Sequence, residues 1–163
     1  MITSIKSFLK SWEYESSSTL KLLEVLTDES LSTEVYPGGR TLGRLANHIL
    51  ESLTELPSKL GLGISERHFD LKTAAEIVQH YKEDSENLVK AIQQHWTDAN
   101  LLEKNNMYGE EWPNGLSLNV LIMHQCHHRG QMTVLMRQAG LMVPGVYGPA
   151  KEEWAAIGMA PME

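Results

Sequence analysis

The chain has 163 residues and a formal net charge of −7, from 14 basic and 21 acidic side chains. This length fits one domain, residues 1–163, with a single core. The acidic balance argues against nucleic-acid binding, because such a surface repels a phosphate backbone. The one cysteine excludes an internal disulfide and is typical of a reducing compartment.

The N-terminal residues lack the apolar segment and the cleavage site of a signal peptide. No apolar run reaches the roughly 18–20 residues of a membrane span. We therefore expect a soluble, cytoplasmic protein without a membrane partner. Plentiful Leu and Met with only 2 Phe favour a helical bundle over a sandwich.

The first third of the chain is predicted to hold two helices. Apolar residues recur at helical spacing from Ile2 to Leu26, which predicts one long helix. Residues 36–40, Tyr-Pro-Gly-Gly-Arg, predict a turn. A second helix is expected to begin at Thr41 and to end near Pro57.

A third helix is predicted from Thr73, which opens a Thr-x-x-Glu capping box, to Trp96. Residues 97–116 form a polar connection rich in turn residues. We expect a short hairpin there, with Asn114-Gly115 at or near its turn. A last short helix is expected from residue 150 to 157.

The stretch from Ser117 to Gly140 is predicted to be one helix, with Ser117 as N-cap and Gly140 as the left-handed residue that ends it. His124 and His128 lie one turn apart on one face, with their Cβ atoms about 5–6 Å apart. Two imidazoles at this separation can converge on one metal ion.

The spacing alone leaves two questions open. Histidines one turn apart can simply be core-edge residues that hydrogen-bond to their neighbours, and this is the more frequent case. His127, three residues after His124, also points in a suitable direction. Spacing therefore does not choose between His127 and His128.

Residues 124–131, His-Gln-Cys-His-His-Arg-Gly-Gln, resemble the H-x-x-x-H-R-x-Q signature of the DinB/YfiT-like family of metal-dependent proteins. The resemblance implies an all-α, up-down-down-up four-helix bundle, here with a short extra C-terminal helix. It also implies a divalent ion held by three histidines, which match His48, His124 and His128. Family members are often homodimers, so a homodimer is expected on the resemblance alone.

Five further residues are candidates for supporting or substrate-binding roles. Gln131 shares the metal-facing side and could orient a ligand. Arg129 points about 100° away and could anchor an anionic substrate, although a structural ion pair is the favoured interpretation. Glu51 could lie near the site, but a solvated acidic face is the favoured interpretation. Tyr108 and Trp112 could cover the pocket, or Trp112 could pack the connection onto the bundle.

Three imidazoles would leave an ion, most simply zinc or nickel, with open positions for water or substrate. Such an ion could activate water for hydrolysis or a thiol for transfer. The resemblance favours transfer of a low-molecular-weight thiol, such as bacillithiol or mycothiol, to small electrophiles in detoxification or a stress response. A metal-dependent hydrolase and a non-enzymatic metal- or ligand-binding stress protein are the alternatives. The chain lacks the H-E-x-x-H pattern of a metalloprotease.

Overall fold

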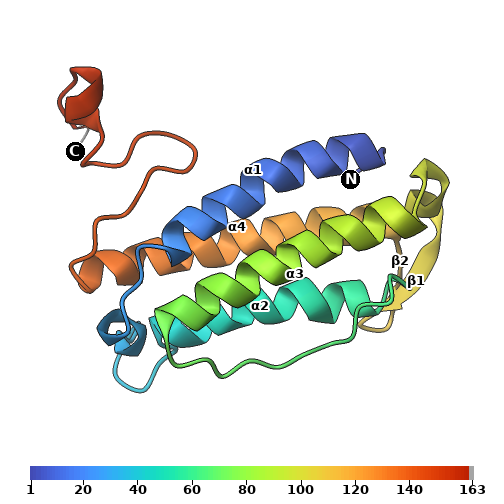
Figure 1. Cartoon of the computed structure of the whole chain (residues 1–163), viewed down its shortest axis with the longest axis horizontal. Helices are drawn as coiled ribbons and strands as arrows, with labels where there is room; N and C mark the ends of the chain where they lie inside the picture. The colour runs from blue at the N-terminus through green and yellow to red at the C-terminus, as the bar shows by residue number, and fades with distance from the viewer. Residues whose placement is uncertain (162–163) are drawn as a thin grey trace.

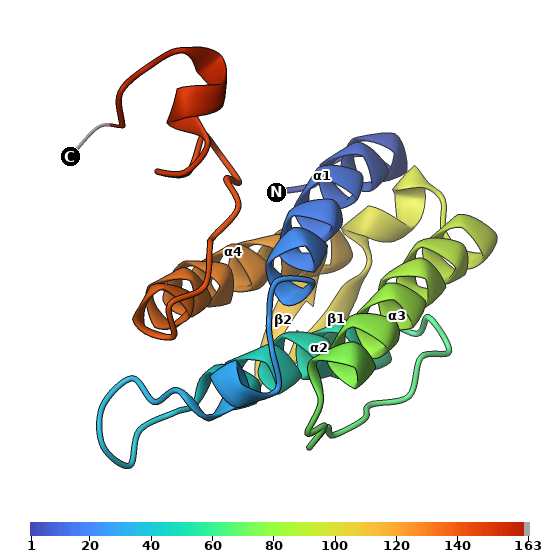
Figure 2. The same cartoon turned by 60° about the vertical axis from the view of Figure 1, so that its left-hand side comes forward.

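The computed structural model describes residues 1–161. Within this range four α-helices pack into a bundle, and they span α1 (Ile5–Leu23), α2 (Leu42–Ser58), α3 (Ala74–His95) and α4 (Asn114–Gln138). Helices α1 and α4 run in one direction and α2 and α3 in the other (Figures 1 and 2). The predicted up-down-down-up order is therefore confirmed. No helix within these residues combines the length and the apolar character that crossing a membrane requires.

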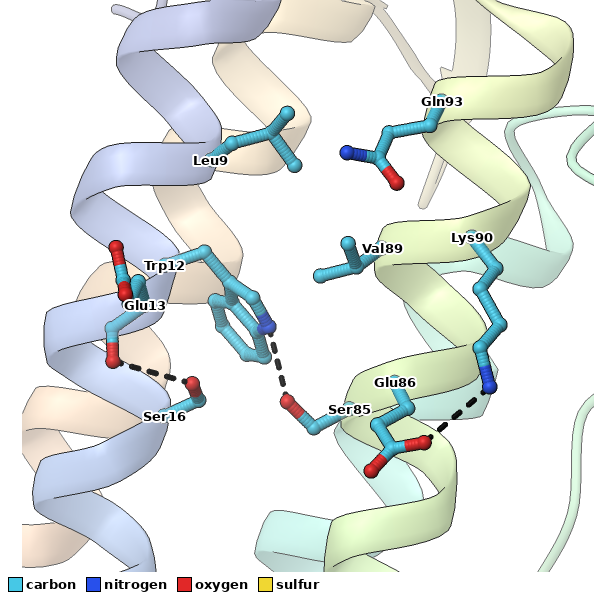
Figure 3. A pocket seen from close by; sticks show the side chains of 9 residues that line it. All are labelled: Leu9, Trp12, Glu13, Ser16, Ser85, Glu86, Val89, Lys90 and Gln93. Carbon is cyan, nitrogen blue, oxygen red and sulfur yellow. Dashed lines mark hydrogen bonds and ion pairs between the residues drawn. The ribbon is translucent and has the colours of Figure 1, made fainter.

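Each helix packs against two others, because α1 and α2 both contact α3 and α4. The core between them contains Phe8 and Trp12 of α1, whose rings stack with centroids 5.9 Å apart. The indole nitrogen of Trp12 donates to the hydroxyl of Ser85 on α3 at 3.0 Å (Figure 3). Helices α2 and α4 are antiparallel neighbours, and they carry the candidate ligands.

The predicted helix starts are confirmed where a side chain caps the first turn. Thr41 accepts a hydrogen bond from the backbone N–H of Arg44 at 3.0 Å, and Thr73 caps α3 in the same way. Helix α1 is shorter than the predicted 2–26. Helix α2 continues to Ser58, so Pro57 lies inside its last turn instead of ending it.

The segment 59–73 must return along the bundle, because α2 and α3 run parallel. Three polar side chains on one face of α2 bind the backbone of this crossing segment and hold it against the helix. The pairs are Asn47 with Leu71, Glu51 with Phe69, and Thr54 with Arg67.

The connection before α4 contains the expected hairpin. Strands β1 (Lys104–Met107) and β2 (Glu110–Pro113) are antiparallel and add a small sheet to the helical fold. Their two-residue turn is Tyr108-Gly109, with φ angles of 58° and 92°, as a type I′ turn requires. The expectation of a turn at Asn114-Gly115 is wrong, because these residues begin α4.

Tertiary contacts explain this difference. Asn114 is fully buried, and its amide donates to the backbone oxygen of Asn100 at 2.9 Å. The N–H of Ile2 donates to the oxygen of Gly115 at 3.1 Å, and a Cβ on Gly115 would lie 2.2 Å from the carbonyl oxygen of Ile2. Helix α4 therefore starts before Ser117, which is buried within the helix and is not its N-cap.

The predicted end of α4 is confirmed. Gly140 has a φ of 75°, and the N–H of Leu141 donates to the oxygen of Met136 at 2.9 Å in a Schellman arrangement. The chain then leaves the bundle (Figure 1). The expected terminal helix is a single 3-10 turn, Trp154–Ile157.

Candidate metal centre

Three histidines from two helices meet at the contact between α2 and α4. His48 comes from α2, and His124 and His128 come from α4. Each offers one ring nitrogen, and these nitrogens lie within 4.8 Å of one another. The ring centroids are 4.4 to 4.9 Å apart. These are the three residues that the family resemblance implies as ligands.

The spacing of these nitrogens fits a shared ion. The two Nε2 atoms of His124 and His128 lie 3.1 Å apart. Two nitrogens bound to one zinc at about 2.1 Å and at a tetrahedral angle would lie roughly 3.4 Å apart. Three neutral imidazoles suit a divalent ion such as zinc or nickel. The group could therefore hold a metal ion.

Two of the three rings are oriented through their second nitrogen. Nδ1 of His128 lies 2.8 Å from Oε1 of Gln131, and Nδ1 of His48 lies 3.5 Å from Oε2 of Glu51. A proton held at Nδ1 leaves the lone pair at Nε2 free for an ion. Within residues 1–161 the buried Nδ1 of His124 has no hydrogen-bond partner. Packing and the contact of its Nε2 with Nε2 of His128 at 3.1 Å therefore orient the ring of His124.

Burial keeps the two α4 histidines neutral. Burial lowers the pKa of His124 to about 4, and the neighbouring imidazoles, first His128, add to this effect. Burial also lowers the pKa of His128. A neutral imidazole is the form that binds a metal, so both rings are in the binding form near neutral pH.

Glu51 is not part of a solvated acidic face, contrary to the favoured expectation, because the crossing segment covers it. Only 9% of it is exposed. Burial alone would raise the pKa of Glu51, but hydrogen bonds from Arg44 and from the N–H of Phe69 outweigh this and lower it. Oε2 accepts from Arg44 at 2.9 Å, and Oε1 accepts from Phe69 at 3.3 Å. Glu51 is thus an ionised carboxylate, well placed to orient His48.

The geometry places His128, and not His127, in the histidine group. His127 is exposed, and its Nε2 lies 3.2 Å from the amide nitrogen of Gln131. Its ring meets that of His128 edge-on, with centroids 4.8 Å apart. His127 therefore borders the site from the solvent side.

Arg129 faces a different part of the interior. It is 3% exposed and forms an ion pair with Glu15 of α1. It also donates to the hydroxyl of Tyr147 at 2.6 Å and lies 3.2 Å from the sulfur of Cys126. Of its two interpretations, the structure favours the ion pair over substrate anchoring at the histidines.

The hairpin aromatics contact α2 and the core further along the bundle from the histidines. The hydroxyl of Tyr108 donates to Glu55 at 2.9 Å, two turns after His48, and so about 10 Å along α2. Trp112 packs against the core from β2, and its ring is 6.0 Å from that of Tyr108. These contacts agree with Trp112 packing the connection onto the bundle.

A residue that the sequence analysis missed sits next to His124. Gln125 is fully buried in the middle of the bundle. Its side chain bonds to all three other helices and so fixes the rotation of α4. The sequence signal that could have identified it is a glutamine on the otherwise apolar face of this helix. Its partners are Thr19 on α1, Ile49 and Ser52 on α2, and Tyr81 on α3.

The fold is similar to solved structures. A DinB-like protein from Bacillus cereus ATCC 10987 shares 49% identity at a TM-score of 0.87, and the match covers 90% of this chain and 100% of the other. YfiT from Bacillus subtilis, described as a probable metal-dependent hydrolase with an unusual four-helix bundle topology, is 19% identical at a TM-score of 0.59. That match covers 83% of this chain and 87% of YfiT. At this identity, the likeness to YfiT shows the fold alone.

Sequence comparison gives the family. The uncharacterized protein YrdA of Bacillus subtilis (strain 168) is 48% identical over 162 residues, which cover 98% of this chain and 97% of YrdA. A family model described as the DinB family matches residues 1–161. The match spans the four helices and all three histidines of the centre. The chain therefore belongs to the DinB family.

Proposed function

We propose that the protein is a metal-dependent transferase in which His48, His124 and His128 hold a divalent ion, zinc or nickel. Its substrates are a low-molecular-weight thiol and a small electrophile. The observation that carries the proposal is the convergence of three ring nitrogens within 4.8 Å. Three protein ligands leave positions open for a substrate, as in catalytic sites. Coordination to such an ion lowers the pKa of a thiol or of water and so supplies a nucleophile.

The surroundings of Glu51 favour a thiol over water as the nucleophile. Hydrolysis at such a centre benefits from a nearby base that removes a proton from water. Glu51 contacts His48, but both of its oxygens already accept hydrogen bonds, and its lowered pKa makes it a weak base. A thiol, whose ordinary pKa is about 8.5, ionises with far less help. Glu51 then serves to orient His48.

A metal-dependent hydrolase is the second candidate. It is supported by the description of YfiT, which shares the four-helix fold, as a probable metal-dependent hydrolase. The same histidines would serve both reactions. The two candidate functions therefore differ in the nucleophile, which is a thiol for the transferase and water for the hydrolase.

Metal content tests the centre first. We expect near-stoichiometric zinc or nickel in the purified wild-type chain and its loss in His48→Ala and His128→Ala. His127→Ala is the matched control, because His127 is an exposed neighbour outside the group. Equal metal loss in the control, or a wild-type chain that cannot be loaded, would reject the centre.

Two assays of the loaded protein then separate the candidate functions. Conjugation of bacillithiol to a chlorodinitrobenzene, abolished by His128→Ala, would support the transferase. Hydrolysis of a nitrophenyl ester that needs no thiol and is also abolished by His128→Ala would support the hydrolase. Neither activity in a fully loaded chain would indicate a non-enzymatic metal-binding protein.

A further inference from the structure

A cavity of about 450 Å³ lies next to the candidate metal centre, between the loop before α2 and the last turns of α4. Gln131 belongs to both places, because it lines the cavity and its oxygen contacts His128. Arg40 also lines this cavity. The cavity therefore adjoins the centre through Gln131.

Arg40 is the unusual residue of this cavity. The chain has five arginines, and four of them pair with a carboxylate. Among residues 1–161, Arg40 has no carboxylate within ion-pair distance. In a chain with a net charge of −7, an unpaired guanidinium beside a cavity favours an anion from outside. The four pairs are Arg44–Glu51, Arg67–Asp84, Arg129–Glu15 and Arg137–Glu152.

The backbone holds Arg40 in a defined place. The N–H of Val35 donates to the oxygen of Arg40 at 3.1 Å, across a turn in which Gly38 has a φ of 77°. Pro37 before this glycine is typical of a type II turn. Thr41, the next residue, caps α2. The backbone of Arg40 is therefore anchored on both sides, which fixes the point beside the cavity from which its side chain extends.

The rest of the wall defines the kind of ligand. Leu45, Val134 and Leu135 contribute apolar side chains, and Gln131 contributes an amide on the side of the histidines. A guanidinium binds a carboxylate through two parallel hydrogen bonds. The wall therefore suits a small molecule with a carboxylate at one end and an apolar body.

We infer that this cavity binds a carboxylate-bearing reactant, with Arg40 as the anchor of its carboxylate and the apolar wall around its body. The reactive end then lies on the side of Gln131 and the histidines. The inference rests on the proposed function and adds the class of substrate. The carboxylate belongs either to the thiol or to the electrophile, and the two arms of the test below distinguish these sources.

A second hollow provides a control. It has a volume of about 510 Å³ and is lined by residues of α1 and α3, whereas the three histidines of the centre lie on α2 and α4 (Figure 3). Its lysine, Lys90, already pairs with Glu86 at 3.2 Å. Lys90→Gln thus makes the same charge change as Arg40→Gln, but at a hollow that does not adjoin the centre.

The first arm uses the full chain loaded with cobalt(II), because thiolate coordination to cobalt adds a visible absorption band. The probes are mercaptopropionate and its neutral amide. We expect the acid to bind roughly tenfold tighter than the amide. This preference should vanish in Arg40→Gln, persist in part in Arg40→Lys and remain unchanged in Lys90→Gln.

The second arm needs no metal. Isocaproate, a thiol-free carboxylate, is titrated into the metal-free chain while methyl NMR signals of Leu45, Val134 and Leu135 are followed. We expect shifts in wild type and none in Arg40→Gln. Val134→Trp, a change at a side chain that is 59% exposed, should block the cavity without loss of the fold.

The outcomes separate the two proposals. Failure to take up cobalt rejects the proposed function, while the isocaproate arm still decides whether the cavity binds an anion. Arg40 dependence in the thiol arm assigns the carboxylate to the thiol, and dependence in the isocaproate arm alone assigns it to the electrophile. Equal affinity for acid and amide, together with no methyl shifts, would overturn the inference.

Discussion

Nδ1 of His128 lies 2.8 Å from the side-chain oxygen of Gln131, one turn later on the same helix. The bond therefore depends only on the local geometry of α4. A proton placed at Nδ1 leaves the lone pair of Nε2 pointing to the other histidines. The α4 sequence alone thus orients Nε2 of His128 and keeps it unprotonated, without any contribution from an ion.

Replacement of Gln131 should weaken metal binding. In Gln131→Leu the tautomer and ring orientation of His128 are no longer fixed, and we expect the metal affinity to fall roughly 10- to 100-fold. Competition with a chromophoric chelator measures this. Gln138→Leu is the control, since Gln138 lines the same cavity without contacting a histidine. An equal loss in both variants would contradict the role of Gln131.

Replacement of Glu51 should act on the metal and on the crossing segment together. Glu51→Leu removes the acceptor for the N–H of Phe69 and the partner of His48. We expect faster hydrogen exchange at the Phe69 amide and a roughly tenfold weaker metal affinity. Glu51→Gln keeps an acceptor and should preserve the amide protection. Normal protection in Glu51→Leu would show that the segment is held without this bond.

The buried amide of Gln125 should be a major contributor to stability. Gln125→Leu leaves the buried hydroxyl of Tyr81 without its acceptor and removes the amide that donates to Ser52. We expect the free energy of unfolding to fall by roughly 2–4 kcal/mol, because each unpaired buried polar group is costly. Urea denaturation of the metal-free chain measures the change. Gln94→Leu, at an exposed position of α3, should change it little.

The metal-free chain should gain stability as the pH rises from about 4 to 6.5. The pKa of His124 is lowered to about 4 in the folded chain, against 6.5 for an ordinary histidine, so the unfolded chain binds more protons in this window. Unfolding free energies measured by urea denaturation across this pH range test the sign. The slope should be smaller in His124→Gln. A slope unchanged by this substitution would assign the effect to other groups.

The ion pair between Glu15 and Arg129 should show the pH dependence of a carboxylate. Burial would raise the pKa of Glu15, but hydrogen bonds from Arg129 and Tyr147 outweigh it and lower the pKa below 4.5. The stabilisation is therefore present above that pH and is lost as the pH falls. Glu15→Gln should cost roughly 3–5 kcal/mol near neutral pH, and this difference should shrink in acid. A difference independent of pH would mean that packing, not charge, is lost.

The helices were predictable because their signals are local. Thr41 and Thr73 cap the helices that follow them, and Gly140 ends α4 in a left-handed conformation. Each signal depends on residues within one turn. The same rules fail at Asn114-Gly115, whose contacts are with Asn100 and Ile2. A pair that usually makes a turn begins a helix here because distant backbone fills the space beside it.

The site was predictable only in part for the same reason. His124 and His128 are set by the period of one helix, but His48 was chosen through the resemblance to a family. The burial of Glu51 could not be predicted from local sequence, because the segment that covers it comes later in the chain and crosses α2. Arg40 looked like a turn residue, and its role depends on the last turns of α4 beside it.

The division of the histidines between α2 and α4 has a consequence for how the protein is made. His48 emerges from the ribosome early, whereas His124 and His128 belong to the last helix of the bundle. A nascent chain that ends before α4 therefore contains only one of the three histidines of the centre, His48. Coordination of an ion by all three histidines would therefore require that α4 has already been made.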